Sequence, residues 1–368
     1  MKTPPRIFVA ATRQDDGKTT TAVGLLMQLM AQQPRVGFIK PVGQRYVELD
    51  DGTKVDKDVW LIRRVLGLSD AAQYMSPVTV PSGFTREYIR QREPERLAAQ
   101  VKEAFAVIAD GKTFVLIEGT GHAGVGAVFD LSNARVAELL GSPVVLVSGG
   151  GIGRPVDEIL LNAALFRQHG VRIAGVILNK VAKERCEEVR EYTSRALAWH
   201  GIKVVGVVPY VPLLSQPTLR EVCRAIAGTF ISCVERDATL YAHVTLLSHF
   251  SLESVRTLLP STLVVATGDQ SEFLVACAGE EPAMWALRAN VCGIVLTDGI
   301  APKPHIVKML QHARVPVILS DMPAYEATSH LSRMVAKLQP DNPEKMEAIS
   351  QLFSEYVDFS TLLEAVRE

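Results

Sequence analysis

Long apolar runs, a cysteine framework and a strong charge of either sign are all missing from this 368-residue sequence. No apolar run approaches the roughly 20 residues that a membrane-spanning helix needs. The five cysteines are scattered without a Cys-x-x-Cys pair, and the eight histidines lack metal-ligand spacing, which favours reduced thiols over a disulfide or zinc framework. The formal net charge of −1 gives no electrostatic basis for binding nucleic acid or an anionic membrane. With a strand within six residues of the N-terminus and no room for a signal peptide, we expect a cytoplasmic protein.

The length and the ordinary composition, 48% hydrophobic and 21% charged residues, predict two globular domains with sizeable cores. Continuously apolar, Val- and Ile-rich runs are typical of strands buried on both faces. They lie at 7–10, 36–39, 114–117, 144–147, 173–178 and 204–208. Amphipathic segments at 95–109, 131–140, 155–169 and 183–200 separate them. This alternation predicts an α/β fold, an open and mostly parallel sheet with helices on both faces, whose ligand crevice lies at the carboxyl ends of the strands.

A proline-rich stretch at 209–217 predicts the end of the first domain, and Thr218 with Glu221 has the spacing of a capping box that begins a new helix. A shorter alternation of strand-like and helical segments at 263–319 predicts a second, smaller α/β domain. We therefore divide the chain into residues 1–212, 213–335 and 336–368. The last segment is predicted to be a helical tail that packs on the second domain, with Ile349, Leu352 and Phe353 on its apolar stripe.

The stretch from Thr12 to Thr20 follows a short strand and precedes an apolar helical face. Strand, turn, Gly-Lys-Thr and helix is the arrangement of a phosphate-binding loop, in which backbone N–H groups and a helix N-terminus meet an anion. The alternative is a loop-to-helix turn with an incidental Gly-Lys. We predict that nucleotide phosphates bind to this stretch, at Thr12, Asp15, Asp16, Gly17, Lys18, Thr19 and Thr20.

Two acidic positions suit a magnesium ion beside this loop. Glu118 ends a buried strand and is followed by a glycine-rich loop. Asp56 and Asp58, at a predicted helix start, are candidates for a second carboxylate directed at the metal. Phosphate-loop proteins need an acid at a strand end to hold magnesium, directly or through water. Turn chemistry at Glu118 and a solvated helix start at Asp58 are the alternatives.

Four further residues follow predicted strands and could face a ligand. Lys40 could bind a carboxylate or phosphoryl group as a point charge, or be an ordinary exposed lysine. Asn179 could recognise a base through its donor and acceptor. Gly151 belongs to a second glycine-rich loop, and His122 could contact an anionic substrate or face solvent.

Together these segments resemble the dethiobiotin synthetase and cobyrinic acid a,c-diamide synthase group of P-loop proteins, which has Thr in place of the first loop glycine, as at Thr12. Lys40-Pro41-Val42, Glu118-Gly119, Asn179 and Val208-Pro209 match that group. The sequence at 121–134 and 151–158 is similar to the dethiobiotin-synthetase-like N-terminal part of long phosphotransacetylases. The second domain resembles the DRTGG domain that follows there, although Asp-Arg reads Asp269-Gln270 and Thr-Gly-Gly reads Thr297-Asp298-Gly299.

The resemblance implies ATP and Mg²⁺ as cofactors, and a homodimer. It implies catalytic roles for Lys18, Lys40 and Glu118, with Thr19, Asp58 and Glu118 on the metal and Asn179 and Pro209 at the adenine. The substrate would meet Lys40, Arg86, Gly121, His122 and Gly151. The chain stops where a phosphotransacetylase catalytic domain would begin, so acetyl transfer is not expected.

Two functions follow from this resemblance. In the first, the protein is an ATPase or ligase that transfers the γ-phosphoryl group to a carboxylate-type small molecule. In the alternative, it is a regulatory module that senses a nucleotide without ligase chemistry, as the N-terminal region of phosphotransacetylase is regulatory. The altered DRTGG residues count against sensing, whereas Lys40 and Glu118 indicate a usable phosphoryl site.

Overall fold

The computed structural model describes residues 3–367, apart from residues 34, 50–51, 252–256, 280–286, 288, 335, 337 and 341. The described residues form two compact units, which are treated separately. Unit 1 comprises residues 1–210 together with 343–368, and unit 2 comprises residues 211–342. The second unit is therefore inserted between two parts of the first.

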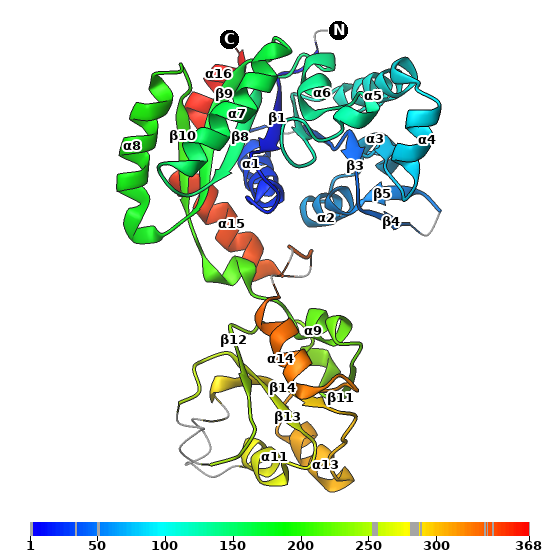
Figure 1. The fold of residues 1–368 in the computed structure, drawn as a ribbon, viewed down its shortest axis with the longest axis vertical. Coiled ribbons are helices and arrows are strands. Elements are labelled where there is room, and N and C mark those ends of the chain that lie inside the picture. The colour runs from blue at the N-terminus through cyan, green and yellow to red at the C-terminus, as the bar shows by residue number, and fades with distance from the viewer. Residues whose placement is uncertain are drawn as a thin grey trace. The chain divides into compact units, whose positions relative to one another are not determined.

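The sheet of unit 1 has six strands, all parallel, in the order β10-β9-β8-β1-β7-β2 (Figure 1). Their bounds are β1 (Arg6–Ala11), β2 (Val36–Ile39), β7 (Phe114–Glu118), β8 (Val144–Gly149), β9 (Ile173–Val181) and β10 (Val204–Pro209). Nearly every residue of the central strands is buried, as the apolar runs predict. The parallel register pairs Val9 with Glu118 and Ala11 with Val147, so the carboxyl ends of neighbouring strands meet at one edge.

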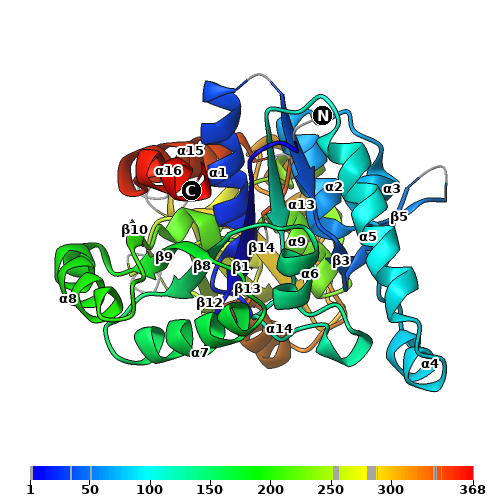
Figure 2. The ribbon, with the colours of Figure 1, turned by 90° about the horizontal axis from the view of Figure 1, so that it is seen from above.

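Helices cover both faces of this sheet (Figure 2). One face carries α1 (Lys18–Gln32), α15 (Pro343–Tyr356) and α16 (Phe359–Arg367); the other carries α5 (Pro94–Ala109), α6 (Asn133–Leu139), α7 (Arg154–Gln168) and α8 (Cys186–Ala198). Between β2 and α5 the chain forms α2 (Lys57–Leu66), α3 (Ala72–Met75), α4 (Phe84–Arg90) and two short strand pairs, β3 (Val42–Gly43) with β6 (Val78–Thr79) and β4 (Tyr46–Glu48) with β5 (Lys54–Asp56). The predicted α/β architecture with helices on both faces is confirmed.

The C-terminal helices correct the prediction that the tail packs on the second domain. Helix α15 contacts α1 and β10, and α16 contacts β9 and β10, all within unit 1. The apolar stripe is real, because Ile349, Leu352 and Phe353 are buried. Phe353 lies against the bare backbone of Gly24 in α1. The apolar stripe shows that α15 packs on another element. Which element it packs on depends on the path of the chain, which returns to unit 1 after unit 2.

Unit 2 is a second α/β layer structure. Its sheet has the order β11-β15-β14-β13-β12, with β12 to β15 parallel and β11 antiparallel to β15. The strands are β11 (Thr229–Ser232), β12 (His243–Leu246), β13 (Thr262–Thr267), β14 (Val291–Thr297) and β15 (Val317–Leu319). The helices are α9 (Leu219–Ala225), α11 (Ser271–Ala278), α13 (Pro304–His312) and α14 (Ala324–Ser332). The predicted capping box at the start of α9 is present, with both Thr218 and Glu221 side chains bonded to backbone N–H groups.

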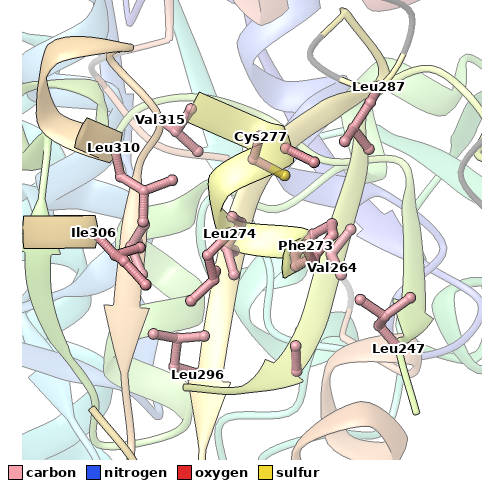
Figure 3. Close-up of a cluster of buried hydrophobic side chains, with 14 of the residues drawn as sticks. Leu247, Val264, Phe273, Leu274, Cys277, Leu287, Leu296, Ile306, Leu310 and Val315 are labelled. Atoms are coloured by element: carbon pink, nitrogen blue, oxygen red, sulfur yellow. The ribbon is translucent and has the colours of Figure 1, made fainter. Parts of the chain in front are cut away.

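Each face of the second sheet has its own apolar core. On one face, side chains of α11 and α13 meet those of β13 and β14 in the cluster drawn in Figure 3, which includes Phe273, Leu274, Val264 and Leu310. On the other face, α9 and α14 pack on the alternate residues of the same strands. Unit 2 thus has a hydrophobic core of its own, as an independent domain requires. None of the described helices of the chain is both long and apolar enough to cross a membrane.

Candidate functional site

The phosphate-binding loop predicted from the sequence joins β1 to α1 at the carboxyl edge of the first sheet. Its start is tied down by Thr12, whose hydroxyl donates to Asp16 Oδ2 at 2.8 Å and is hydrogen-bonded to the Ser148 hydroxyl at 2.9 Å. Asp16 Oδ2 also accepts from the Arg13 backbone N–H at 2.9 Å, and burial raises the pKa of this carboxyl. The Asp16 carboxylate therefore holds the beginning of the loop, at Thr12 and Arg13, to its end.

Helix α1 begins directly after Gly17, which has a left-handed conformation with φ of 89°. No side chain caps this helix, so the N–H groups of its first turn, which includes Thr19 and Thr20, remain without a side-chain acceptor. A 15-residue helix with a positive N-terminal end and uncapped donors is suited to an anion.

Asn179 and Lys180 brace the same loop from the end of β9. Asn179 Nδ2 donates to the Asp16 carbonyl at 3.0 Å, and Lys180 Nζ donates to the Asp15 carbonyl at 2.6 Å. A Cβ atom at Gly17 would lie 2.1 Å from Asn179 Nδ2, so only glycine fits there. Pro209 is buried at the end of β10, opposite Val181. The adenine role of Asn179 and Pro209 stays a prediction, and the structure adds a bracing role for Asn179.

Thr19 and Glu118 are 99 positions apart in the sequence, but their side chains are in contact in the folded chain. The Thr19 hydroxyl donates to Glu118 Oε1 at 3.0 Å, while Glu118 Oε2 is buried and has no hydrogen-bond partner among the described residues. The Glu118 side chain is fully buried, and burial together with the charge of Asp58 raises its pKa to about 7. A buried acceptor without a donor is a costly arrangement that a bound cation would satisfy.

Lys40 is buried, so the alternative interpretation of an ordinary exposed lysine is wrong. It is only 5% exposed, and its ammonium group is 2.8 Å from Asp56 Oδ1 and also paired with Asp58. Burial alone would lower the pKa of Lys40, but the charges of Asp58, Glu118 and Asp56 raise it above its ordinary value. The lysine is therefore held as a cation within an acidic cluster.

Asp56 fixes the geometry of this cluster. Its carboxylate caps α2 by accepting from the Asp58 backbone N–H at 2.9 Å, and its own N–H donates to Ser76 Oγ at 3.0 Å. A solvated helix start was the alternative interpretation of these acids. Asp56 does lie at the start of α2 and caps it, but it is buried rather than solvated. Burial would raise the pKa of Asp58, but the charge of Lys40 and its hydrogen bond hold that pKa below the usual range.

Lys18 belongs to the same cluster. Burial lowers the pKa of its ammonium, and the charge of Glu118 opposes this shift. The nearby charges of Lys40, Asp58 and Asp56 also act on it, so five ionisable groups interact at this one edge of the sheet. Two are cations and three are carboxylates.

The oxygen donors of the cluster fit a magnesium ion. Mg²⁺ is bound through one or two carboxylates completed by waters and substrate phosphates. Thr19, Asp58 and Glu118 supply a hydroxyl and two carboxylates, and the unpartnered Glu118 Oε2 is an available ligand atom. Across the described parts of the chain, no group of three or more His, Cys, Asp or Glu side chains could hold a metal alone.

The glycine-rich loop after Glu118 is held in place by two asparagines that the sequence did not single out. Asn133 Oδ1 accepts from the Thr120 N–H at 2.9 Å and its Nδ2 donates to the His122 carbonyl at 2.7 Å. Asn162 Oδ1 accepts from the Ala123 N–H at 2.8 Å, from the buried side of α7. Asn162 could have been found from the sequence, because it is a polar residue within the apolar stripe of a predicted helix.

The residues expected to hold a substrate lie on or after different elements, and their shared role stays a prediction. The His122 side chain is exposed, and its Nδ1 accepts from the Gly124 N–H at 3.2 Å. Arg86 is exposed on α4, which contacts the short helix η1 (Ala127–Phe129) rather than α1. Gly121 and Gly151 both have positive φ, in the loops after β7 and β8. Only Lys40 lies within the charged cluster.

Two family models match the chain, and the boundary between them lies close to the boundary between units 1 and 2. The AAA domain family matches residues 5–218, and the DRTGG domain family matches residues 221–334. The chain is 23% identical to a phosphate acetyltransferase of Nitrosomonas europaea over 95% of its length, and 26% identical to that of Deinococcus radiodurans over 96%. It covers 50% of each, so the chain spans about half the length of these curated relatives.

Among solved structures, the chain is similar to the septum site-determining protein MinD of Pyrococcus horikoshii complexed with Mg-ADP. The two are 17% identical, with a TM-score of 0.37, over 57% of this chain and 83% of the other. It is also similar to the CBS and DRTGG domains of a Clostridium perfringens pyrophosphatase complexed with diadenosine tetraphosphate, at 14% identity and a TM-score of 0.24, over 38% and 60% of the two chains.

Proposed function

The chain belongs to the AAA domain family, and from that premise we propose that unit 1 binds Mg-ATP at the loop between β1 and α1. The observation that carries the proposal is the contact of Thr19 with Glu118 at 3.0 Å, directly beside the uncapped start of α1. It places a hydroxyl and a buried carboxylate next to the donors that suit phosphate. Lys18 would meet the outer phosphates, and Thr19, Asp58 and Glu118 would hold the metal.

The residues of the chain would act mainly by positioning and electrostatics, as in other phosphoryl-transfer sites. The α1 N–H groups would hold the β-phosphate side of the nucleotide, and Lys18 would compensate charge on the γ-phosphoryl oxygens. A bound magnesium ion supplies further neutralisation of those oxygens. Asn179 would keep the loop open to the phosphates by holding the Asp16 carbonyl away from them.

Nucleotide sensing is the use of this site that the geometry favours. Arg86 and His122, two residues expected to hold a carboxylate substrate, are exposed, and neither has a described contact with the charged cluster. The relatives also support regulation, because the chain matches half of phosphate acetyltransferases and carries a DRTGG domain. Transfer of the γ-phosphoryl group to a carboxylate is the second candidate, supported by the place of Lys40 beside Asp58.

ATP binding by the purified chain tests the proposal directly. Calorimetric titration with ATP and Mg²⁺ should show one site in the wild type, and Lys18→Ala should abolish it while far-UV circular dichroism stays unchanged. Lys102→Ala, an exposed lysine on α5, is the matched control and should bind normally. An unaltered ATP affinity of Lys18→Ala would contradict the assignment.

Release of ADP from ATP distinguishes the two uses of the site. The assay would be run alone and with a panel of small carboxylic and diamine metabolites. Stimulation by one compound would identify a ligase and its substrate class. Tight ATP binding with negligible ADP release under every condition would support the sensor.

A further inference from the structure

We propose that Lys40 is a built-in counter-ion that occupies the cation position of the acidic cluster and must leave it before a divalent ion can bind. The inference rests on the proposed function, because it concerns the order in which metal and nucleotide enter that site. Its consequence is that the wild-type chain binds a divalent ion weakly unless nucleotide phosphates are present.

The contacts of Lys40 place its ammonium among the carboxylates rather than beside them. Lys40 Nζ lies 2.8 Å from Asp56 Oδ1 and is also paired with Asp58, and the side chain is only 6% exposed. Asp56 is 1% exposed and is held by the Asp58 and Ser76 contacts, so it is the fixed partner. Asp58, with a 31% exposed side chain, is the more accessible one. Asp58 pairs with Lys40 and is also one of the expected metal ligands.

The charges of the cluster explain why the two cations compete. Lys18 and Lys40 face Asp56, Asp58 and Glu118, which leaves one uncompensated negative charge. A divalent ion added beside the ammonium groups of Lys18 and Lys40 would turn this into a net positive charge, which a low-dielectric site disfavours. A nucleotide brings several negative charges, which would compensate the displaced ammonium group of Lys40. Metal entry is therefore coupled to nucleotide entry.

Glu118 provides an independent reason to expect a ligand at this point. Its Oε2 is buried and has no hydrogen-bond partner among the described residues, although Oε1 accepts from Thr19. Lys40 compensates the charge of the cluster without donating a hydrogen bond to this oxygen. The cluster thus has one buried carboxylate oxygen without a hydrogen-bond donor, and a metal ion would satisfy it.

Binding of Mn²⁺ alone tests the inference, with free manganese measured by electron paramagnetic resonance in the absence of nucleotide. Lys40→Met removes the internal cation and should bind Mn²⁺ at least about tenfold more tightly than the wild type, because one buried unit charge is worth more than one factor of ten. Lys112→Met is the matched control, since Lys112 also pairs with an aspartate, Asp70, at 2.8 Å in unit 1. It should leave the affinity unchanged.

A lysine removed from a buried ion pair can destabilise the fold, so a second variant is needed. Lys40→Met combined with Asp56→Asn removes one positive and one negative charge, so the cluster keeps the net charge of the wild type. It frees Asp58 from its ion pair with Lys40, and for that reason it should still bind Mn²⁺ more tightly than the wild type. No gain in either folded variant, or an equal gain in Lys112→Met, overturns the inference. Because this assay uses the metal alone, it remains readable if the ATP titration fails, and the two proposals can fail separately.

Discussion

Replacing Gly24 with alanine tests the packing of the C-terminal helix on the helix that follows the phosphate loop. Gly24 is in the middle of α1, where glycine normally costs about 1 kcal/mol relative to alanine. Helix propensity alone therefore predicts that Gly24→Ala stabilises the protein. The structure predicts the opposite sign, because the new Cβ would lie 2.3 Å from the Phe353 ring.

The magnitude follows from the overlap. Phe353 is 1% exposed on α15, and α15 is further tied to α1 by a hydrogen bond from Gln28 Nε2 to the Ser350 carbonyl at 3.2 Å. The ring cannot turn away freely, and overpacking of this kind costs about 1–3 kcal/mol. Because three ring atoms lie within 2.8 Å of the new Cβ, we expect a cost in the upper part of this range, about 2–3 kcal/mol. Set against the gain in helix propensity, we expect a net loss of about 1–2 kcal/mol and a fall in the melting temperature of about 2–8 °C.

Urea unfolding and thermal melts would measure the change. In Gly24→Ala combined with Phe353→Leu, the loss should be smaller than the sum of the single losses, since the smaller side chain makes room for the methyl group. Gly153→Ala is the control, because a Cβ there meets nothing within 4 Å. A stabilised Gly24→Ala variant, or strictly additive single losses, would refute the packing of α15 on α1.

Two further predictions concern the site itself. Gly17→Ala should weaken ATP binding at least about tenfold and destabilise unit 1 by about 2 kcal/mol, because it imposes a side chain at φ of 89° and displaces Asn179 from the Asp16 carbonyl. Calorimetry would measure the loss of binding and urea unfolding the loss of stability. Normal ATP binding by this variant would exclude the bracing role of Asn179. Glu118 has a folded pKa raised to about 7 by burial and by Asp58, so the stability that it contributes is present below its ordinary pKa of 4.5 and is lost as the pH rises through about 7. Relative to the wild type, Glu118→Gln should therefore gain on the order of 3 kcal/mol between pH 4.5 and pH 8, and a difference that is independent of pH would show that Glu118 stays ionised throughout.

The sequence by itself determined the layered α/β architecture and the place of the phosphate loop. Both depend on local information: apolar runs specify buried strands, and a strand followed by Gly17, Lys18 and Thr19 at a helix start specifies the loop. Because all six strands are parallel, residues at their carboxyl ends had to meet at one edge. This is why Glu118, Lys40 and Asn179 could be selected as candidates without coordinates.

Only the tertiary structure decided what those residues do there. The burial of Lys40 depends on β5 and the start of α2, which bring Asp56 and Asp58 to it from positions 16 and 18 residues along the chain. The return of α15 to unit 1 depends on the path of the chain through 132 intervening residues, 211–342. Charge pairing and helix docking are long-range choices among several compatible partners. An amphipathic stripe or a strand-end lysine specifies that a partner is needed, and the folded chain decides which one.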